Sequence, residues 1–375
     1  MKIAAITNSR IPSLTANSLQ AMKVCDALRE AGHDLHLFAP READPAGWER
    51  LAAHYGLSHP FEVTWLPSLR AARRYDFIWY AQAAAGRSGA ELIYTWLPQS
   101  AAIGLWRGYP VVLEMHADVA GRLGAWWLRQ FWARPGRKRM LATTKALKAA
   151  LERSIGLALP EDGVQIAPNG VDLDRYANLP DAQEARRRLS LADGPTAGFT
   201  GHFYAGRGMD LLFELARTMP ALQFIWAGGT SRAVAEWRGK LQAAGVSNVT
   251  LPGFIENSRL PLYQAAADVL LMPYGRSISA SSGQDIAGVI NPMKMFEYMA
   301  AGRAIISADL PVIREVLDET RAVFCEPDDL PEWTAALGAL LADPDRRKEL
   351  AAKARAEVEK YTWQARARRA LQAML

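Results

Sequence analysis

Two series of short apolar segments, each followed by a helical or polar stretch, constrain the fold of this chain more than any other feature. Apolar runs of this length, separated by amphipathic helices, are typical of strands that are buried on both faces. The pattern therefore predicts an α/β fold with parallel sheets covered by helices. The first series comprises residues 2–7, 34–39, 61–65, 92–95, 111–115, 140–144 and 164–167, and the second comprises 197–200, 222–227, 249–251, 269–272, 304–307 and 322–325.

The alternation is interrupted at residues 168–176, PNGVDLDRY, where Pro, Asn and Gly mark a turn. A charged helix follows, so we place a boundary there and predict doubly wound, Rossmann-like domains at 1–180 and 181–355. The length of 375 residues suits two domains better than one core. The last segment, 356–375, is expected to be a helix that packs back on the first domain. Because such sheets bind ligands at the carboxyl ends of their strands, two of them predict a cleft and an enzyme with two substrates.

Bulk composition indicates a globular chain. Hydrophobic residues make up 50% of the sequence and charged residues 22%, which argues against disorder. No apolar run is long enough to span a bilayer, and a strand-like segment stands where a signal sequence would be, so we expect a cytoplasmic protein. The formal net charge of +5 fits an anionic substrate, a membrane surface or neither.

Cysteine and histidine usage predicts neither a disulfide nor a metal site. Cys25 and Cys325 lie within apolar patterns, so we expect both to be buried as small hydrophobic residues. The six histidines show no metal-ligand spacing with cysteines or carboxylates. We therefore expect no metal and no bound cofactor.

The loop after the first strand lacks the glycine patterns of common nucleotide sites. The segment ITNSRIPSLTANSLQAM contains no G-x-G-x-x-G, and no G-x-x-x-x-G-K-[ST] occurs, which disfavours nicotinamide redox and P-loop chemistry. A polar loop that ends at Ser13 leads instead into a helix opened by Thr15 or Asn17. The N–H groups of this helix could face the cleft, and the alternative is an ordinary strand-to-helix loop.

A glycine-rich turn opens the second series at residues 198–216, GFTGHFYAGRGMDLLFELA. A diphosphate requires a close backbone approach and a fixed positive charge, and Gly201, Arg207 and Gly208 can supply both. His202 is a second cationic side chain in the same turn. The alternative is a solvated arginine at a helix start.

The stretch NPMKMFEYMAAG, residues 291–302, indicates a helix that Asn291 and Pro292 open and that a glycine ends. The free N–H groups of such a helix start bind anions. Lys294 and Glu297 follow one turn apart, an arrangement that suits a ligand with phosphates and hydroxyls. The alternative is an ordinary capped helix.

Glu114, His116 and Asp118 lie at the carboxyl end of the apolar segment 111–115. A histidine between two acids at this position can meet a substrate hydroxyl. Because an isolated histidine is more often structural, the pattern alone leaves both interpretations open.

The segment GRLGAWWLRQFWARPGRKRM, residues 121–140, interleaves aromatic with basic side chains. Amphipathic helices of this kind lie in anionic membrane interfaces, which would suit a lipid-linked acceptor and a place at the inner face of the cell membrane. No nucleic-acid partner is expected, because no recognised binding module accompanies the segment. The alternative is a helix that packs in the core and has a solvated basic end.

Four stretches carry a family resemblance: NSLQAMKVCDALREAGHDLHLFAP, APNGVDLDRY, GHFYAGRGMDLL and NPMKMFEYMAAGRAIISADLPVIREVL. They resemble the retaining glycosyltransferase family 4, of GT-B fold, over almost the whole chain, and the last two are the most specific. The resemblance implies transfer of a sugar from a nucleoside-diphosphate sugar to a hydroxyl acceptor, with retention of configuration and without a metal. It also implies that the first domain receives the acceptor and the second binds the donor.

The resemblance assigns the phosphate-binding residues of the donor site. Arg207 stands where the family has the lysine of its cationic clamp, and His202 stands where an arginine is common. The Asn-Pro-x-Lys-x-Phe-Glu-Tyr form resembles a subgroup with Ser-Pro-x-Lys, in which the helix start and Lys294 do more of the phosphate work. Together with Gly201 and Gly208, these residues would hold the diphosphate.

The resemblance also assigns residues to the nucleoside and the sugar. Glu297 matches the second carboxylate of a Glu–seven residues–Glu motif that holds the ribose. Val289 occupies the position of the first carboxylate, so sugar recognition departs from the family at this point, and Asp285 or Gln284 is the expected substitute. Phe254 matches the segment whose backbone contacts the nucleotide base.

On the acceptor side, His116 matches a family histidine, and we add Ser13, Asn17 and Asp118 as neighbours. We predict His116, Arg207 and Lys294 as the catalytic residues. The predicted function is transfer of a hexose from a UDP- or GDP-sugar to a glycan, a lipid-linked or a small-molecule acceptor. A nucleotide-sugar 2-epimerase, a sugar phosphorylase and a non-catalytic nucleotide-sugar-binding protein remain alternatives, and an epimerase would act without any acceptor.

Overall fold

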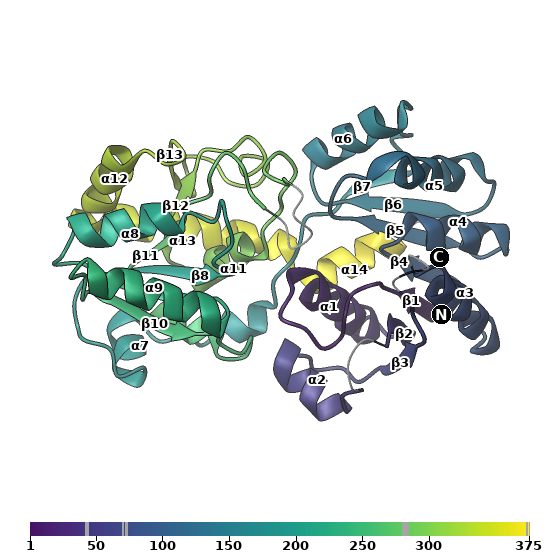
Figure 1. Cartoon of the computed structure of the whole chain (residues 1–375), viewed down its shortest axis with the longest axis horizontal. Coiled ribbons are helices and arrows are strands. Elements are labelled where there is room, and N and C mark those ends of the chain that lie inside the picture. Colours follow the sequence, from purple (N-terminus) through teal and green to yellow (C-terminus); the bar gives the residue numbers. More distant parts are fainter. Residues whose placement is uncertain (42–44, 70, 72–73, 280–284, 373, 375) are drawn as a thin grey trace. The chain divides into compact units, whose positions relative to one another are not determined.

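The computed structural model describes residues 1–41, 45–69, 71, 74–279, 285–372 and 374. The chain folds into two compact units (Figure 1). Met1–Gly170 and Trp363–Leu375 form the first unit, and Val171–Thr362 form the second. Each unit contains a sheet with parallel neighbouring strands. The predicted α/β class with two Rossmann-like units is therefore confirmed.

Within its described residues, the first unit has a seven-stranded sheet of order β3-β2-β1-β4-β5-β6-β7. The order reverses between β1 and β4, and sheets of this type bind ligands at the carboxyl ends of the strands beside such a reversal. β4 and β5 are buried along their whole length, which explains their continuous apolar sequence. The strands are β1 (Lys2–Ile6), β2 (Asp34–Pro40), β3 (Glu62–Leu66), β4 (Leu92–Thr95), β5 (Val111–Met115), β6 (Lys138–Ala142) and β7 (Val164–Ile166).

Helices cover the first sheet in two groups. In one group each helix from α3 to α6 packs on the next one. In the other group α1 contacts both α2 and α14. Right-handed crossovers place the helices on both faces of a sheet whose strand order reverses. The helices are α1 (Ala16–Glu30), α2 (Trp48–Tyr55), α3 (Tyr75–Arg87), α4 (Pro98–Trp106), α5 (Gly121–Ala133), α6 (Lys145–Ile155) and α14 (Trp363–Leu371).

The described part of the second unit has a six-stranded sheet of order β10-β9-β8-β11-β12-β13, which reverses between β8 and β11. β8 and β11 are its two central strands, and β11 and β12 are buried along their whole length. Its strands are β8 (Thr196–Gly201), β9 (Gln223–Gly228), β10 (Val249–Gly253), β11 (Val269–Met272), β12 (Ala304–Ala308) and β13 (Val323–Cys325). Its helices are η1 (Leu173–Tyr176), α7 (Ala182–Arg188), α8 (Met209–Thr218), α9 (Ser231–Ala243), α10 (Leu260–Ala265), α11 (Met293–Ala301), α12 (Leu330–Ala342), α13 (Pro344–Glu357) and η2 (Val358–Tyr361).

The first unit ends at Gly170, ahead of the boundary predicted after residue 180. Val171 already belongs to the second unit, because its N–H donates to the carbonyl of Tyr361 at 2.9 Å. The buried hydroxyl of Tyr176 likewise donates to Gln264 at 2.9 Å. The turn residues in PNGVD thus mark the boundary itself, and the charged helix lies wholly inside the second unit.

The chain returns to the first unit at Trp363 and not at the predicted residue 356. α13 continues to Glu357, and η2 stays in the second unit because the ring of Tyr361 packs on Phe296 of α11, with centroids 5.2 Å apart. α14 then packs on α1 in the first unit.

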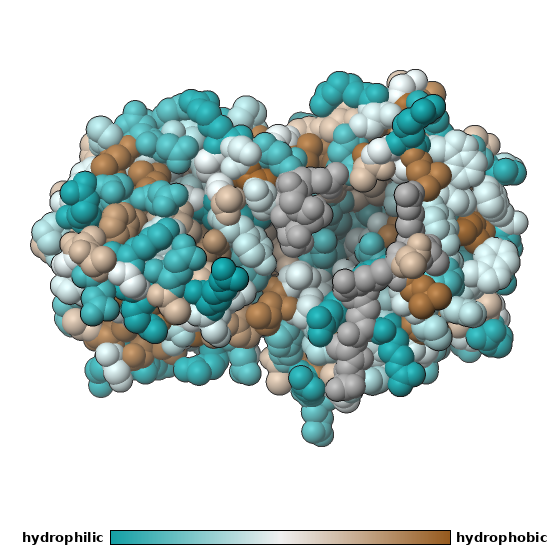
Figure 2. Space-filling model, viewed as in Figure 1, coloured by the Kyte–Doolittle hydropathy of each residue, from teal (hydrophilic) through white to brown (hydrophobic). Residues whose placement is uncertain are grey.

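The described residues include no helix with both the length and the apolar character that crossing a bilayer requires. On the face drawn in Figure 2, hydrophobic residues lie scattered among hydrophilic ones. Isolated exposed apolar residues are normal and by themselves indicate no binding surface.

Candidate functional site

In the second unit, the candidate donor residues gather at the carboxyl ends of β8 and β11, beside the reversal of strand order. Gly201 ends β8 with φ +143°, and a Cβ on it would lie 2.8 Å from Nζ of Lys294. Glycine at this position therefore gives the lysine room to reach the backbone of β8. Lys294 is on the first turn of α11, which Pro292 caps and Gly302 ends with φ +62°.

The ammonium group of Lys294 is buried and has no hydrogen-bond partner among the described residues. It lies 3.8 Å from the ring centroid of Phe199 and 5.3 Å from that of Tyr274. Burial and the nearby charge of Arg207 lower the pKa of Lys294 well below its usual range, against the opposing effect of Glu297. Because burial disfavours the charged form of this amine, an anion bound beside it would stabilise its protonated state.

Arg207, in the turn before α8, lies close enough to this lysine for the two charges to interact. Its guanidinium is 5.4 Å from the centroid of the Tyr274 ring, and its Nε has no hydrogen-bond partner in the described structure. Gly208 follows with φ +78°, and a Cβ on it would overlap the carbonyl oxygen of Pro273. The glycine therefore lets the turn before α8 lie directly on the backbone after β11.

His202, predicted as a second cation in this turn, stacks on Tyr204. The two rings are 4.8 Å apart and nearly parallel. The structure thus places His202 beside the candidate phosphate site with its ring face covered by an aromatic side chain.

Glu297 is held by a buried hydrogen-bond relay that the sequence did not indicate. Nε2 of Gln264 donates to Oε2 of Glu297 at 3.2 Å and to the hydroxyl of Thr200 at 3.3 Å. The oxygen of Gln264 accepts the hydroxyl of Tyr176. Gln264 lies in α10, where it occurs in an otherwise apolar pattern, and only that isolated polar residue could have signalled its role.

The remaining donor-site residues differ in exposure. Asn291 is buried just before α11, whereas Phe254, which follows β10, is 44% exposed. Asp285 uses one carboxylate oxygen to accept the N–H groups of Ile278 and Ala287, at 3.0 and 2.9 Å. The carboxylate of Asp285 is thus engaged with neighbouring backbone N–H groups. Gln284, the other expected substitute for a carboxylate at position 289, lies outside the described residues.

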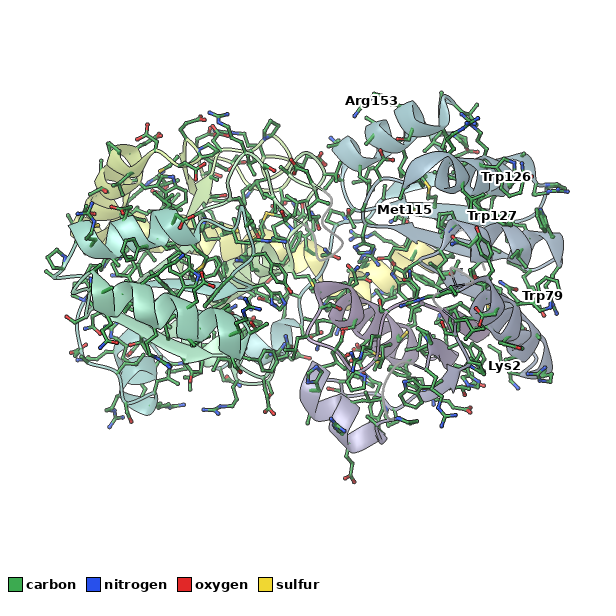
Figure 3. All side chains as sticks on the ribbon, viewed as in Figure 1. Lys2, Trp79, Met115, Trp126, Trp127 and Arg153 are labelled. Atoms are coloured by element: carbon green, nitrogen blue, oxygen red, sulfur yellow. The ribbon has the colours of Figure 1, made fainter. Side chains whose placement is uncertain are left out.

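In the first unit, a hollow of about 400 Å³ opens at the carboxyl ends of β4 and β5. Its lining joins residues that are far apart in the sequence, among them Asn17, Gln20, Trp96, Glu114, His116, Asp118 and Trp127. Figure 3 labels Met115 and Trp127, which both belong to this lining. The hollow is the natural place for a small polar ligand.

His116 is anchored by Glu114 at the base of this hollow. Nε2 of His116 lies 2.5 Å from Oε1 of Glu114, and the imidazole is 23% exposed whereas the carboxylate is fully buried. Gln20, Tyr94 and Arg366 also donate to this carboxylate. Burial would raise the pKa of Glu114, but Arg366 and His116 lower it below its usual range, so the carboxylate is ionised.

Two of the predicted acceptor-side residues serve the local fold. Asp118 lines the hollow, but its carboxylate accepts the hydroxyl of Ser154 at 2.6 Å and the N–H of Val119 at 2.8 Å. Ser13 is not part of the lining. Its carbonyl and hydroxyl are engaged with Tyr55 and Ser18 in the turn before α1.

The segment 121–140 is mainly a core element. Its helix α5 buries Trp127, Leu128 and Phe131, and the ammonium of Lys138 caps its carboxyl end by donating to the carbonyls of Phe131 and Trp132 at 3.1 and 2.8 Å. Of its aromatic residues Trp126, Trp127, Phe131 and Trp132, Trp126 is the most exposed, at 41%. Figure 3 labels Trp126 and its buried neighbour Trp127.

A second hollow lies over α5 and adjoins the first, since Val119 and Leu123 line both. Arg122, Trp126 and Arg129 also line it. Among the described residues, no group of three or more His, Cys, Asp and Glu side chains is arranged to hold a metal ion. Metal independence stays a prediction.

Known proteins resemble each half of this chain. Residues 20–175 match the profile of Glycosyltransferase Family 4, and residues 194–343 match that of Glycosyl transferases group 1. The D-inositol 3-phosphate glycosyltransferase of Xylanimonas cellulosilytica is 31% identical over 236 residues, which cover 60% of this chain and 53% of that protein. A GDP-mannose-dependent alpha-(1-6)-phosphatidylinositol monomannoside mannosyltransferase of Mycolicibacterium smegmatis is 28% identical over 217 residues, 56% of each chain. The matched region thus spans about half the length of these relatives.

Solved structures with the same fold cover almost the whole chain. Sucrose-phosphate synthase from Thermosynechococcus elongatus superposes with a TM-score of 0.77 at 19% identity, over 100% of this chain and 98% of that one. Anabaena HepE in complex with UDP-glucose gives a TM-score of 0.77 at 15% identity, over 100% and 99%.

Two Rossmann-like units with a candidate site at the strand reversal of each define the GT-B class of glycosyltransferase folds. Within that class, the chain belongs to glycosyltransferase family 4.

Proposed function

We propose that this chain is a retaining glycosyltransferase that moves a hexose from a nucleoside-diphosphate sugar to a hydroxyl group of its acceptor, without a metal ion. The observation that carries the proposal is the buried, unpartnered ammonium of Lys294 beside Arg207 and Gly201. Two cations and an open helix start at one sheet edge form a site for a diphosphate.

Departure of the nucleoside diphosphate is the step that these cations would assist. As the bond between the anomeric carbon and the phosphate oxygen breaks, negative charge grows on that oxygen, and Lys294, Arg207 and the free N–H groups of α11 stabilise it. The acceptor hydroxyl bonds to the anomeric carbon on the same face. Its proton passes to the departing phosphate oxygen, so no protein base is required.

The other donor residues would hold the nucleoside and the sugar. Glu297, fixed by Gln264, is suited to accept the ribose hydroxyls, because a carboxylate accepts two hydrogen bonds from neighbouring hydroxyls. The backbone near Phe254 would contact the base. A UDP- or GDP-sugar is the favoured donor, since one relative is named for GDP-mannose and a GT-B structure holds UDP-glucose.

The acceptor would occupy the hollow of the first unit. His116 lines this hollow and is held there by its hydrogen bond to Glu114. Relatives named for inositol 3-phosphate and a phosphatidylinositol mannoside favour a polyol, free or lipid-linked. The adjoining hollow over α5 offers Arg122, Arg129 and Trp126 to an anionic lipid interface at the inner face of the cell membrane. Sedimentation with phosphatidylglycerol vesicles tests that contact, and failure to sediment would remove it.

A donor panel tests the proposal most directly. UDP-, GDP-, ADP- and dTDP-sugars are compared by thermal shift, and the stabilising donor is then followed by NMR with inositol 3-phosphate or another polyol as acceptor. We expect Arg207→Ala and Glu297→Ala to abolish transfer with the fold intact. Arg217→Ala is the matched control, because Arg217 lies at the end of α8, the helix that follows Arg207, and forms an exposed ion pair with Glu214.

The outcomes separate the proposal from its alternatives. An α-linked donor that yields a β-linked product would contradict retention, and activity that is lost with chelators would contradict metal independence. Epimerisation of the donor without acceptor would identify an epimerase instead. Binding of no nucleotide sugar would refute the donor-site assignment.

A further inference from the structure

Arg366 reaches the base of the acceptor hollow from the far end of the sequence. It lies on α14, and its guanidinium donates to both carboxylate oxygens of Glu114, at 3.1 and 2.6 Å. Its Nε donates to the carbonyl of Pro168 at 3.0 Å. One side chain therefore ties the C-terminal helix, the end of β5 and the segment after β7 together.

The pair of Arg366 and Glu114 is almost completely excluded from water, with exposed side-chain fractions of 2% and 0%. Burying two charges is expensive, and well-packed apolar residues would stabilise a protein as well or better. A buried ion pair at the base of a ligand hollow is therefore better explained by a role in that site than by stability alone.

Hydrogen bonds from four side chains hold the carboxylate of Glu114 in place. Oε1 accepts from Gln20, His116 and Arg366, and Oε2 accepts from Tyr94 and Arg366. Arg366 is the only one of these partners that binds both oxygens, so it sets the plane of the carboxylate.

The position of this carboxylate decides which nitrogen of His116 carries a proton. Because an ionised carboxylate can only accept, Nε2 of His116 must donate to it. In the neutral imidazole this leaves Nδ1 without a proton, as the ring atom that can accept a hydrogen bond from a ligand hydroxyl.

We propose that Arg366 is a positioning residue for the transfer reaction: through Glu114 it holds His116 in one ring orientation and in the Nε2–H tautomer. This inference rests on the proposed function of His116 in the acceptor hollow. A lysine in place of Arg366 keeps the charge but cannot bind both oxygens in a plane.

The tautomer is tested in the unliganded full-length chain, independently of activity. Histidine labelled with ¹⁵N is observed by NMR above pH 8, and His116→Gln identifies the signal of residue 116. We expect the Nε2–H tautomer in the wild type and a mixture of both tautomers in Arg366→Lys. An unchanged signal in this variant would overturn the proposal.

A double-mutant cycle tests the catalytic consequence. Release of nucleotide from UDP-glucose or GDP-mannose, with water as acceptor, is measured for Arg366→Lys in the wild type and in His116→Ala. In the wild type, kcat should fall by about ten- to a hundredfold, as expected for a misplaced group, with KM for the donor unchanged. In the His116→Ala background the same substitution should have no further effect. Equal losses in both backgrounds would show that Arg366 does not act through His116.

Two further variants keep the test decisive. Leu371→Ala weakens the packing of α14 but keeps Arg366, so it should lower Tm and leave kcat unchanged. If Arg366→Lys does not fold, Glu114→Gln combined with Arg366→Met removes both charges, and a mixed tautomer is again expected because an amide both donates and accepts. A wild type that neither releases nucleotide with water nor transfers a sugar from any donor of the panel to a polyol would refute the proposed function, while the NMR result would still decide the positioning role.

Discussion

At the residue scale, Lys294 connects the physics of burial to the binding of a donor. Its ammonium has no hydrogen-bond partner among the described residues, so a bound diphosphate would accept its first hydrogen bonds. We expect Lys294→Met to weaken binding of the stabilising nucleotide sugar by about 1.5–3 kcal/mol, the range for a hydrogen bond to a charged group. The measurement is isothermal titration calorimetry at pH 7. Equal affinity of variant and wild type would contradict the phosphate role.

The same lysine predicts how donor affinity depends on pH. Burial and Arg207 lower its pKa in the free protein, and a bound diphosphate raises that pKa again. Binding then takes up a proton, so affinity should fall as the pH rises through the window between the lowered pKa and the ordinary value of about 10.4. Lys294→Met should flatten this slope. Titration of the nucleotide base and of Tyr274 contributes equally to both proteins and therefore cancels in the comparison. Parallel slopes would mean that Lys294 binds no phosphate.

At the element scale, Gly208 shows why the turn between β8 and α8 tolerates no side chain. We expect Gly208→Ala to destabilise the second unit by more than the roughly 1–3 kcal/mol of a left-handed alanine, because its Cβ would also overlap the carbonyl of Pro273. Gly245→Ala is the matched control, since it has φ +68° and no atom within 4 Å of its Cβ. Urea unfolding compares the two, and equal losses would show that the overlap relaxes.

Arg366, on the C-terminal helix α14, should make the stability of the protein depend on pH in the acid range. With Arg366 present, the pKa of Glu114 is lowered in the folded protein. The contribution of Glu114 to folding stability is therefore complete above the ordinary pKa of about 4.3 and is lost as the pH falls toward the lowered pKa. In Arg366→Met, burial instead raises that pKa, and the variant should be less stable by about 3–5 kcal/mol at pH 7. The deficit should shrink as the pH falls toward 4. Urea unfolding of variant and wild type at pH 7 and pH 4 measures this deficit, and an equal deficit at the two pH values would contradict the prediction.

Elements of this chain could be predicted from its sequence where local patterns determine them. The alternation of apolar strands and helices indicated both sheets, and a proline and a glycine marked the ends of α11. The segment 121–140 shows the limit of such patterns, because its aromatic residues look alike in sequence. Only packing decides that Trp127 is buried and Trp126 exposed.

At the scale of the whole molecule, the sequence could not reveal contacts between distant segments. Arg366 and Glu114 are 252 positions apart, and nothing in the local pattern of either residue indicates the other. Gln264 and Glu297, separated by 33 positions, present the same difficulty on a smaller scale. The predicted site therefore contained the groups that would meet ligands but lacked the residues that hold those groups in place.

The division of the chain into two units yields a last prediction. The candidate phosphate and ribose groups, Arg207, Lys294 and Glu297, all lie in the second unit, whereas His116 lies in the first. We therefore expect His116→Ala to bind UDP or GDP with wild-type affinity while transfer falls at least tenfold, within the usual range for loss of a positioned polar group. Arg207→Ala should lose nucleotide binding as well. Calorimetry with the bare nucleotide and a transfer assay check both. Loss of nucleotide affinity in His116→Ala would show that the first unit also contacts the donor's diphosphate or nucleoside.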